Sequence, residues 1–238
     1  MTQDSPIAVV TGIGRTGQTG EVIARVLAET GMRIVAIARS GDEAKARADD
    51  LRAAGHDAQS FACDLSDESQ VANLARDIAK IAGAPPRIAA LVNIAGGFGM
   101  SGPVADSTFD VWHTQVSINL ITAYLATRAF LPMLRAARGA IVYFSSAAAL
   151  PGANVSRMWA YAASKSGVIA LMRAVAEEER TSGVRANALA PTAIRTEANQ
   201  SSMGDKTKYV EREDVAAAVS WLCSDASRAV TGQVIRLG

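Results

Sequence analysis

Short apolar runs alternate along this chain with longer stretches in which apolar residues recur at helical spacing. The short runs are nearly continuous in Val, Ile, Leu and Ala, which is typical of strands covered on both faces of a parallel sheet. This pattern predicts seven strands, at residues 7–11, 33–38, 58–62, 88–93, 140–145, 185–189 and 233–236.

The longer stretches predict helices at residues 21–30, 42–54, 68–82, 109–138, 159–182 and 213–224. Glycine follows most of them at the expected stop: Gly31, Gly55, Gly83, Gly139 and Gly183. A helix cap is expected near Ser66. Alternating strands and helices predict a doubly wound, Rossmann-type α/β fold, in one domain over residues 1–238. Ligands of such sheets bind past the carboxyl ends of the strands.

The composition supports a folded globular chain. Of 238 residues 49% are hydrophobic, so the chain can bury a sizeable core, which excludes a disordered protein. Two cysteines, Cys63 and Cys223, exclude a disulfide scaffold. Lys and Arg number 24 against 23 Asp and Glu, so no net field attracts nucleic acid or an anionic membrane. With no basic leader in residues 1–4 and no spanning apolar run, we expect a soluble cytoplasmic protein.

A glycine-rich turn follows the first predicted strand. It contains Gly12, Gly14, Gly17 and Gly20, and a helix comes directly after it. Glycines let the backbone approach a pyrophosphate, which then lies on the helix N-terminus. The turn therefore predicts a dinucleotide site, although an ordinary strand–helix turn remains the alternative.

The end of the second strand bears on the choice of cofactor. An NAD enzyme usually places Asp or Glu there to bind the ribose hydroxyls, but this chain has Ala38 followed by Arg39. Arg39, with Arg15 from the glycine-rich turn, could clamp a 2′-phosphate, or both could be surface residues. NADP(H) is therefore the preferred cofactor, with NAD(H) possible. After the third strand, Asp64 could accept from the adenine amino group or could cap the next helix.

The sharpest chemical signal is Tyr161-Ala162-Ala163-Ser164-Lys165 within a predicted helix. Positions four apart share one helix face, and a nearby ammonium would lower the pKa of the Tyr161 phenol toward neutral pH. Ser145-Ser146 ends the fifth strand, and Asn119 lies in the helix before it. Topology places these polar residues beside the expected cofactor site.

These motifs together resemble the classical short-chain dehydrogenase/reductase family over essentially the whole chain, from residue 7 to 238. The resemblance implies that Tyr161 exchanges a proton with the substrate, Lys165 binds the nicotinamide ribose, Ser146 binds the reacting oxygen and Asn119 holds a water in a proton relay. It further implies cofactor contacts from Gly12, Arg15, Gly17, Gly20, Arg39, Asp64, Leu65, Asn93, Ala95, Gly96, Tyr161, Lys165, Pro191 and Thr196.

The chain departs from the family pattern at several points. The glycine-rich turn is two residues longer than usual, so Gly12 and Gly20 take the outer positions while the middle one falls to Gly17 or Gln18. Ile94 stands where a second Asn is common. The spacing from Ser146 to Tyr161 is also about two residues longer than usual.

Other chemistry is disfavoured. His56 and His113 are the only histidines and lack ligand spacing with either cysteine, so no metal site is expected. Glu177-Glu178-Glu179 is interpreted as a solvated helix face. The apolar residues Phe98, Met100, Met158 and Trp159 flank the expected site and indicate either an apolar substrate pocket or plain core.

The hypothesis from the sequence is an NADP(H)-dependent oxidoreductase that transfers a hydride between nicotinamide and a carbonyl or secondary alcohol. A catalytically idle NAD(P)-binding scaffold on the same fold is the alternative. An enoyl reductase is disfavoured, because those relatives place Tyr seven residues before Lys, where this chain has Met158. Residues 197–210 are expected to cover the small-molecule substrate. The apolar helices at 109–138 and 159–182 predict a homodimer or homotetramer.

Overall fold

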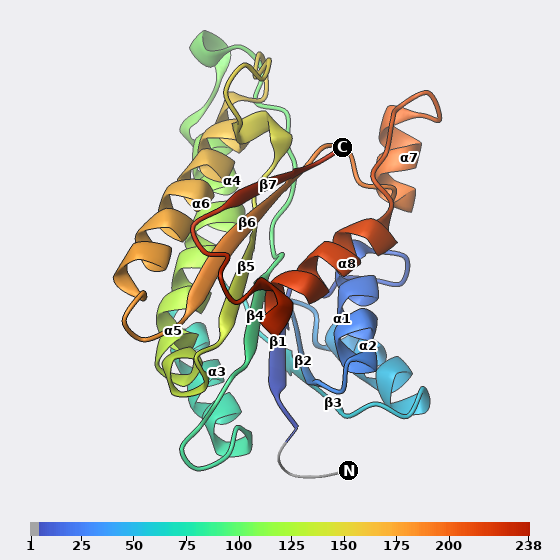
Figure 1. Cartoon of the computed structure of the whole chain (residues 1–238). Coiled ribbons are helices and arrows are strands. Elements are labelled where there is room, and N and C mark those ends of the chain that lie inside the picture. Colours follow the sequence, from blue (N-terminus) through green and yellow to red (C-terminus); the bar gives the residue numbers. More distant parts are fainter. Residues whose placement is uncertain (1–4) are drawn as a thin grey trace.

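Seven parallel strands form one sheet in the order β3-β2-β1-β4-β5-β6-β7 (Figure 1). The computed structural model describes residues 5–238, and the expectation for residues 1–4 lies outside them. The strands are β1 (Ile7–Thr11), β2 (Arg33–Ala38), β3 (Ala58–Ala62), β4 (Ala90–Asn93), β5 (Ala140–Phe144), β6 (Arg185–Pro191) and β7 (Val234–Leu237). The predicted Rossmann-type sheet is confirmed.

Helices cover both faces of the sheet. They are α1 (Thr19–Glu29), α2 (Gly41–Ala53), α3 (Glu68–Ile81), α4 (Phe109–Val116), α5 (Thr122–Ala137), α6 (Trp159–Glu178), α7 (Glu197–Met203) and α8 (Arg212–Cys223). In Figure 1, α3, α4, α5 and α6 lie on one face, and α1, α2 and α8 lie on the other. Helix α7 lies beyond the sheet, near its carboxyl edge, and was not predicted as a helix.

Alternate residues of each strand enter two separate cores. Val9 and Leu91 pack with Phe130 of α5, whereas Val10 and Val92 join the core under α1 and α8. These residues are fully buried. Burial on both sides explains why the strands are continuously apolar.

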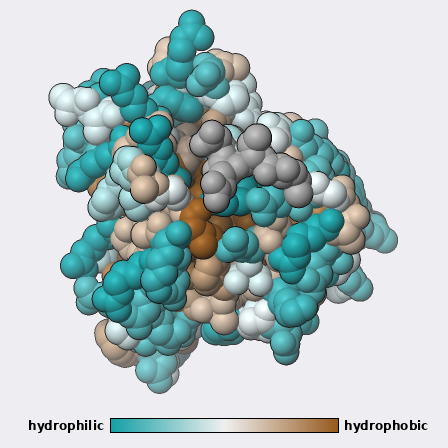
Figure 2. Space-filling model, turned by 90° about the horizontal axis from the view of Figure 1, so that it is seen from below, coloured by the Kyte–Doolittle hydropathy of each residue, from teal (hydrophilic) through white to brown (hydrophobic). Residues whose placement is uncertain are grey.

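The strand order reverses between β1 and β4, which pair from Ala8↔Ala90 to Thr11↔Asn93. The turns that follow these two strands therefore leave the sheet side by side and run to opposite faces. A crevice at the carboxyl ends is expected at this point. Figure 2 shows the opposite end of the molecule, where a hydrophilic surface surrounds a narrow apolar area.

Two helix ends differ from expectation. Arg138, not Gly139, takes the left-handed conformation after α5, with φ 51°. A Cβ on Gly139 would lie 2.7 Å from the carbonyl oxygen of Ile88, so this glycine is required for close packing. Helix α3 is capped by Asp67, which accepts from Ser69 N and Gln70 N, so the cap lies in the region expected near Ser66, one residue further along.

The long helix expected at 109–138 is interrupted by a π-helical turn at Ser117–Ile121. Within residues 5–238, the stretch Phe109–Ala137 is also the one helix long and apolar enough to span a membrane by length and composition alone. Part of its apolar surface packs in the core, where Phe130 and Leu134 are fully buried.

Candidate active site

A cleft of about 860 Å³ opens at the carboxyl ends of the strands, over the β1–β4 junction. Its volume is ample for a cofactor or substrate. Of the residues predicted to form the site, it is lined by Gly12, Arg15, Gly20, Arg39, Gly96, Tyr161, Lys165, Pro191 and Thr196. Gly17, Asp64, Leu65, Asn93, Ala95, Asn119 and Ser146 do not line it directly.

The glycine-rich turn forms one wall of the cleft. A Cβ on Gly12, at φ +62°, would lie 2.6 Å from the Cα of Ala95, and one on Gly20 would lie 2.5 Å from the carbonyl oxygen of Ile13. Only glycine fits either close approach. Gly14, at φ +74°, lines the cleft. Of the two residues considered for the middle position, Gln18 lines the cleft and Gly17 does not.

These residues fit a dinucleotide. Helix α1 begins at the cleft wall, and its N-cap residue, Gln18, gives no side-chain hydrogen bond to the first turn. The amide groups there, together with the helix dipole, favour a pyrophosphate. The glycines leave the adjoining backbone accessible to a ligand. The cleft also has cationic side chains, with Arg15 and Arg39 at one end and Lys165 at the other.

One end of the cleft lies beyond β2. Arg39 is exposed there, beside Ser40 and Glu43. Arg15 Nε donates to Glu43 Oε1 at 2.8 Å. Glu43 was not singled out from the sequence, because nothing in the pattern of α2 distinguishes it from the other acidic residues of that helix.

Asp64 holds the turn after β3. Its Oδ1 accepts from Ser66 N at 2.9 Å and from Ser66 Oγ at 2.6 Å, and these bonds lower the pKa of the carboxyl. It does not cap α3, since Asp67 does. Neighbouring Leu65 is buried in the core with α3. An adenine contact from either residue stays a prediction.

The segment after β4 supports the cleft from beneath. Asn93 is buried and its Nδ2 donates to Thr127 Oγ1 at 3.1 Å, while Ala95 N donates to Thr11 Oγ1 at 3.3 Å. These bonds fix the path of the chain into Gly96. The glycine approaches Lys165 closely, because a Cβ there would lie 3.2 Å from Lys165 Nζ.

Asn119 lies in the π-helical turn and is buried. Its Oδ1 accepts from Gly97 N at 3.1 Å, and its Nδ2 donates to the carbonyl oxygens of Gly97 at 3.0 Å and Gln115 at 3.1 Å. π-helical turns are frequent at functional sites. The side chain is thus occupied in positioning the Gly96-Gly97 segment, and its proton-relay role stays a prediction.

The two serines after β5 have different partners. Ser145 is buried, and its Oγ donates to the carbonyl oxygen of Lys165 at 2.9 Å. Ser146 Oγ accepts from Ala148 N at 3.2 Å. Of the two serines, Ser146 is the one that lowers the pKa of the Tyr161 phenol.

Tyr161 and Lys165 lie one turn apart on α6 and both face the cleft. The Lys165 ammonium is 5.9 Å from the centre of the Tyr161 ring and donates to the carbonyl oxygen of Phe144 at 2.8 Å. Lys165 is almost fully buried, and desolvation lowers its pKa to about 8. The ammonium is held on a main-chain carbonyl, without a carboxylate partner in the described chain.

The expected lowering of the Tyr161 pKa was wrong for this form of the protein. Burial of the phenol raises the pKa, and the nearby Ser146 offsets only part of that effect. The ammonium that was expected to stabilise tyrosinate points at Phe144 instead.

Phe98 and Thr196 also line the cleft. Phe98 is 58% exposed and packs edge-on against the Tyr161 ring, with centroids 5.1 Å apart. Thr196 is the N-cap of α7 and accepts from Asn199 N at 3.2 Å. Trp159 stacks on Trp112, with centroids 5.9 Å apart, and does not line the cleft.

Cys63, Cys223 and His113 lie outside the cleft. Burial raises the pKa of the Cys63 thiol to about 11 and that of Cys223 to about 12, and both are free. His113 is exposed. Among residues 5–238 no group of three potential ligands is arranged to hold a metal ion.

Glu179 overturns the interpretation of Glu177-Glu178-Glu179 as a solvated face. Its side chain is only 3% exposed and accepts two hydrogen bonds from Arg135, at 2.8 and 2.5 Å. Ser182 Oγ donates a third at 2.7 Å. The pair joins α5 to the end of α6, a contact that helical periodicity does not reveal.

Fold and site together define a Rossmann-type dinucleotide-binding protein with a Ser-Tyr-Lys group at its crevice. Residues 12–237 match a family model described as enoyl-(acyl carrier protein) reductase. Galactitol 2-dehydrogenase of Rhizobium johnstonii is 34% identical over 98% of this chain and 94% of its own. The 3-oxoacyl-[acyl-carrier-protein] reductase of Bos taurus is 33% identical over 91% of this chain and 90% of its own.

A gluconate 5-dehydrogenase from Burkholderia cenocepacia, solved in complex with NADP and tartrate, superimposes with a TM-score of 0.89. It is 27% identical and covers 98% of this chain and 94% of its own. The chain belongs to the short-chain dehydrogenase/reductase family and is an oxidoreductase of the kind that acts on alcohol and keto groups.

Proposed function

We propose that this protein is an NADP(H)-dependent oxidoreductase that interconverts a carbonyl and a secondary alcohol, with Tyr161 as general acid and base. The observation that carries the proposal is that Tyr161, Lys165 and the glycine-rich turn line one cleft, with Ser146 near enough to lower the pKa of the phenol. A half-buried phenol at a cleft wall is suited to exchange a proton with a bound oxygen.

The cofactor would lie along the cleft, with its pyrophosphate on the turn from Gly12 to Gly20 and its nicotinamide half toward Lys165, Pro191 and Thr196. When bound, nicotinamide supplies the hydride chemistry. The chain's own residues bind and orient the cofactor and the substrate, and they exchange the proton with the substrate oxygen. Further contacts from Gly17, Asp64, Leu65, Asn93 and Ala95 remain part of the proposal.

In the reducing direction, Tyr161 donates its phenolic proton to the carbonyl oxygen of the substrate, and Ser146 donates a hydrogen bond to that oxygen. In the oxidising direction, Tyr161 must first be ionised, so that it can accept the proton of the alcohol. The Lys165 ammonium is placed to bind ribose hydroxyls once it leaves the Phe144 carbonyl. Asn119 maintains the Gly96-Gly97 segment beside it.

The preference for NADP(H) rests on Arg39 and Arg15, which stand together at the adenosine end. An arginine can bind a 2′-phosphate through paired, charge-assisted hydrogen bonds. Arg39→Ala should weaken NADPH binding by roughly 10- to 150-fold and leave NADH nearly unchanged. Equal losses for both cofactors would show that Arg39 does not touch the phosphate.

The substrate would enter beside Phe98 and the segment 197–210. This is supported by Ala198 and Asn199 of α7, which line the cleft together with Phe98. We further propose a single domain over residues 1–238, a cytoplasmic location and assembly as a homodimer or homotetramer. Exposed Phe109, Trp112 and Tyr124 on the α4–α5 stretch support assembly, since large exposed apolar side chains often mark an interface.

The proposal is tested by a panel of carbonyl substrates with NADPH, followed by loss of nicotinamide absorbance. Sugar ketones and β-keto thioesters head the panel, because relatives are named for such chemistry. Ser146→Ala should lower turnover of any substrate found by about 10²-fold, the scale of a lost proton-transfer partner. Exposed Ser156, mutated to Ala, is the matched control. If Ser146→Ala consumed NADPH at the same rate as the wild-type protein, the proposal would be contradicted.

A further inference from the structure

The adenosine end of the cleft contains one carboxylate among its lining residues in the described chain, that of Glu43. The cations of the cleft are Arg15, Arg39 and Lys165. The usual position for a ribose-binding acid, at the end of β2, is occupied by buried Ala38. Glu43 lies further along the chain, in the first turn of α2.

The position of Glu43 is fixed from two sides. Its backbone N–H donates to the Ser40 hydroxyl, the N-cap of α2, at 3.3 Å. Its Oε1 accepts from Arg15 Nε at 2.8 Å. The first turn of a helix favours a negative charge, so the carboxylate is stabilised in its ionised form at this place.

The pair leaves hydrogen-bonding capacity on both partners. In the described chain, Glu43 Oε2 accepts no protein hydrogen bond, and neither Nη of Arg15 donates one. The carboxylate can therefore still accept from a hydroxyl, and the guanidinium can still bind an anion. Both groups line the same end of the cleft.

We propose that Glu43 is a cofactor-specificity residue that keeps NAD(H) usable and limits the preference for NADP(H). With NAD(H), its free oxygen accepts from the ribose 2′-hydroxyl, in place of the acid missing at Ala38. With NADP(H), its charge repels the 2′-phosphate and competes for Arg15. This inference rests on the proposed function, since it assumes that the adenosine half lies at this end.

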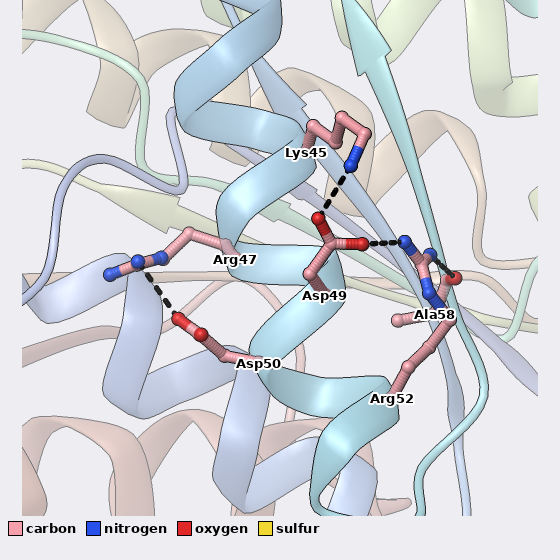
Figure 3. A network of polar contacts seen from close by, with 6 residues as sticks. All are labelled: Lys45, Arg47, Asp49, Asp50, Arg52 and Ala58. Atoms are coloured by element: carbon pink, nitrogen blue, oxygen red, sulfur yellow. Dashed lines mark hydrogen bonds and ion pairs between the residues drawn. The ribbon is translucent and has the colours of Figure 1, made fainter.

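Glu43 can be changed without releasing the glycine-rich turn. Arg47, one turn further along α2, hydrogen-bonds Thr16 Oγ1 and is held by Asp50 at 2.8 Å; Figure 3 shows that ion pair apart from the Lys45–Asp49–Arg52 group. Gly17 N also donates to Glu21. Two anchors of the turn therefore remain in a Glu43 variant.

The test is direct titration of NADPH and of NADH into the wild-type protein, Glu43→Gln and Asp42→Asn, at low ionic strength. Gln keeps the shape of the side chain and removes its charge. Asp42 also lies in the first turn of α2, but it does not line the cleft, so its variant controls for net charge. Thermal unfolding of each variant checks the fold.

Glu43→Gln is expected to tighten NADPH and weaken NADH, so that the ratio of their dissociation constants shifts toward NADPH about fivefold, the scale of one exposed charge interaction. The shift should shrink in high salt. An unchanged ratio in Glu43→Gln, or an equal shift in Asp42→Asn, would overturn the inference while leaving the proposed function intact. Failure of the wild-type protein to bind either cofactor would instead overturn the proposed function, and the inference with it.

Discussion

The Lys165 ammonium donates a 2.8 Å hydrogen bond to the carbonyl oxygen of Phe144, the last residue of β5. This bond ties the helix that carries Tyr161 to the strand that precedes Ser146. It also explains why the phenol gains little from the nearby charge, since the ammonium is directed away from it. Burial then dominates, raising the pKa of Tyr161 and lowering that of Lys165 to about 8.

The first prediction concerns the pH dependence of cofactor binding. If binding favours the protonated amine, affinity depends on pH above the pKa of the free protein and not below it. The dissociation constant for NADPH should therefore be flat below a pH of about 8 and should rise above it. Lys165→Met should remove the break. A wild-type profile that stays flat to pH 10 would show that the ammonium does not contribute to binding.

The second prediction concerns Gly96. A Cβ at this position would lie 2.5 Å from Asn119 Oδ1 and 3.2 Å from Lys165 Nζ, so Gly96→Ala must displace one of them. Catalytic efficiency should fall by about 10- to 100-fold, as expected for a small misplacement of catalytic groups. In Gly97→Ala the nearest atom, Ile118 Cδ1, is 3.4 Å away, and activity should be retained. Similar losses in both variants would indicate a general backbone effect.

The third prediction concerns the buried Glu179. Glu179→Gln leaves the hydrogen bonds from Arg135 and Ser182 without their charge and should lower the free energy of unfolding by about 1–3 kcal/mol at pH 7. The pKa of this carboxyl is held below its usual value, mainly by Arg135, so its contribution is present above about pH 4.5 and lost as the pH falls through the lowered value. Exposed Glu178, changed to Gln, is the control, and urea denaturation is the measurement. Equal stability of the two variants would contradict the assigned role.

Much of the fold could be predicted from hydrophobic pattern alone. The bounds of β1, β2 and β3 agree with expectation. Strands β1 and β2 are almost entirely buried and apolar, whereas β3, at the edge of the sheet, is mostly half-buried. Strand β4 begins at Ala90 rather than residue 88, and Ile88 N donates to Met133 O of α5 rather than to a strand. Helix α7 was missed because its sequence is polar and its start is set by the Thr196 cap.

The site was predictable in its residue types and less so in its contacts. Strand ends and the four-residue spacing of Tyr161 and Lys165 place polar side chains at one crevice. The direction of the Lys165 ammonium, the Arg15–Glu43 pair and the Asn119–Gly97 bonds depend on tertiary geometry between distant segments. Local sequence patterns do not predict such contacts.

The fourth prediction concerns assembly. Sedimentation at micromolar concentration should give a dimer or a tetramer, because Phe109 is 72% exposed and Tyr124 is 45% exposed on the α4–α5 stretch. Phe109→Glu should weaken association. Met203→Glu, at an exposed apolar residue of α7, should not. A wild-type monomer would contradict the proposed assembly.

The central claim, that Tyr161 is the acid–base group, is tested most directly by the rate of alcohol oxidation against pH. Oxidation needs ionised Tyr161, whose pKa in the unliganded protein is raised by burial, so the wild-type rate should climb as the pH rises through the alkaline range. Tyr161→Phe should bind cofactor normally, lose about 10²-fold or more in rate and lose this pH limb. Exposed Tyr124→Phe should keep both. A Tyr161→Phe variant with the wild-type rate and the same limb would show that the phenol is structural and that the account is wrong.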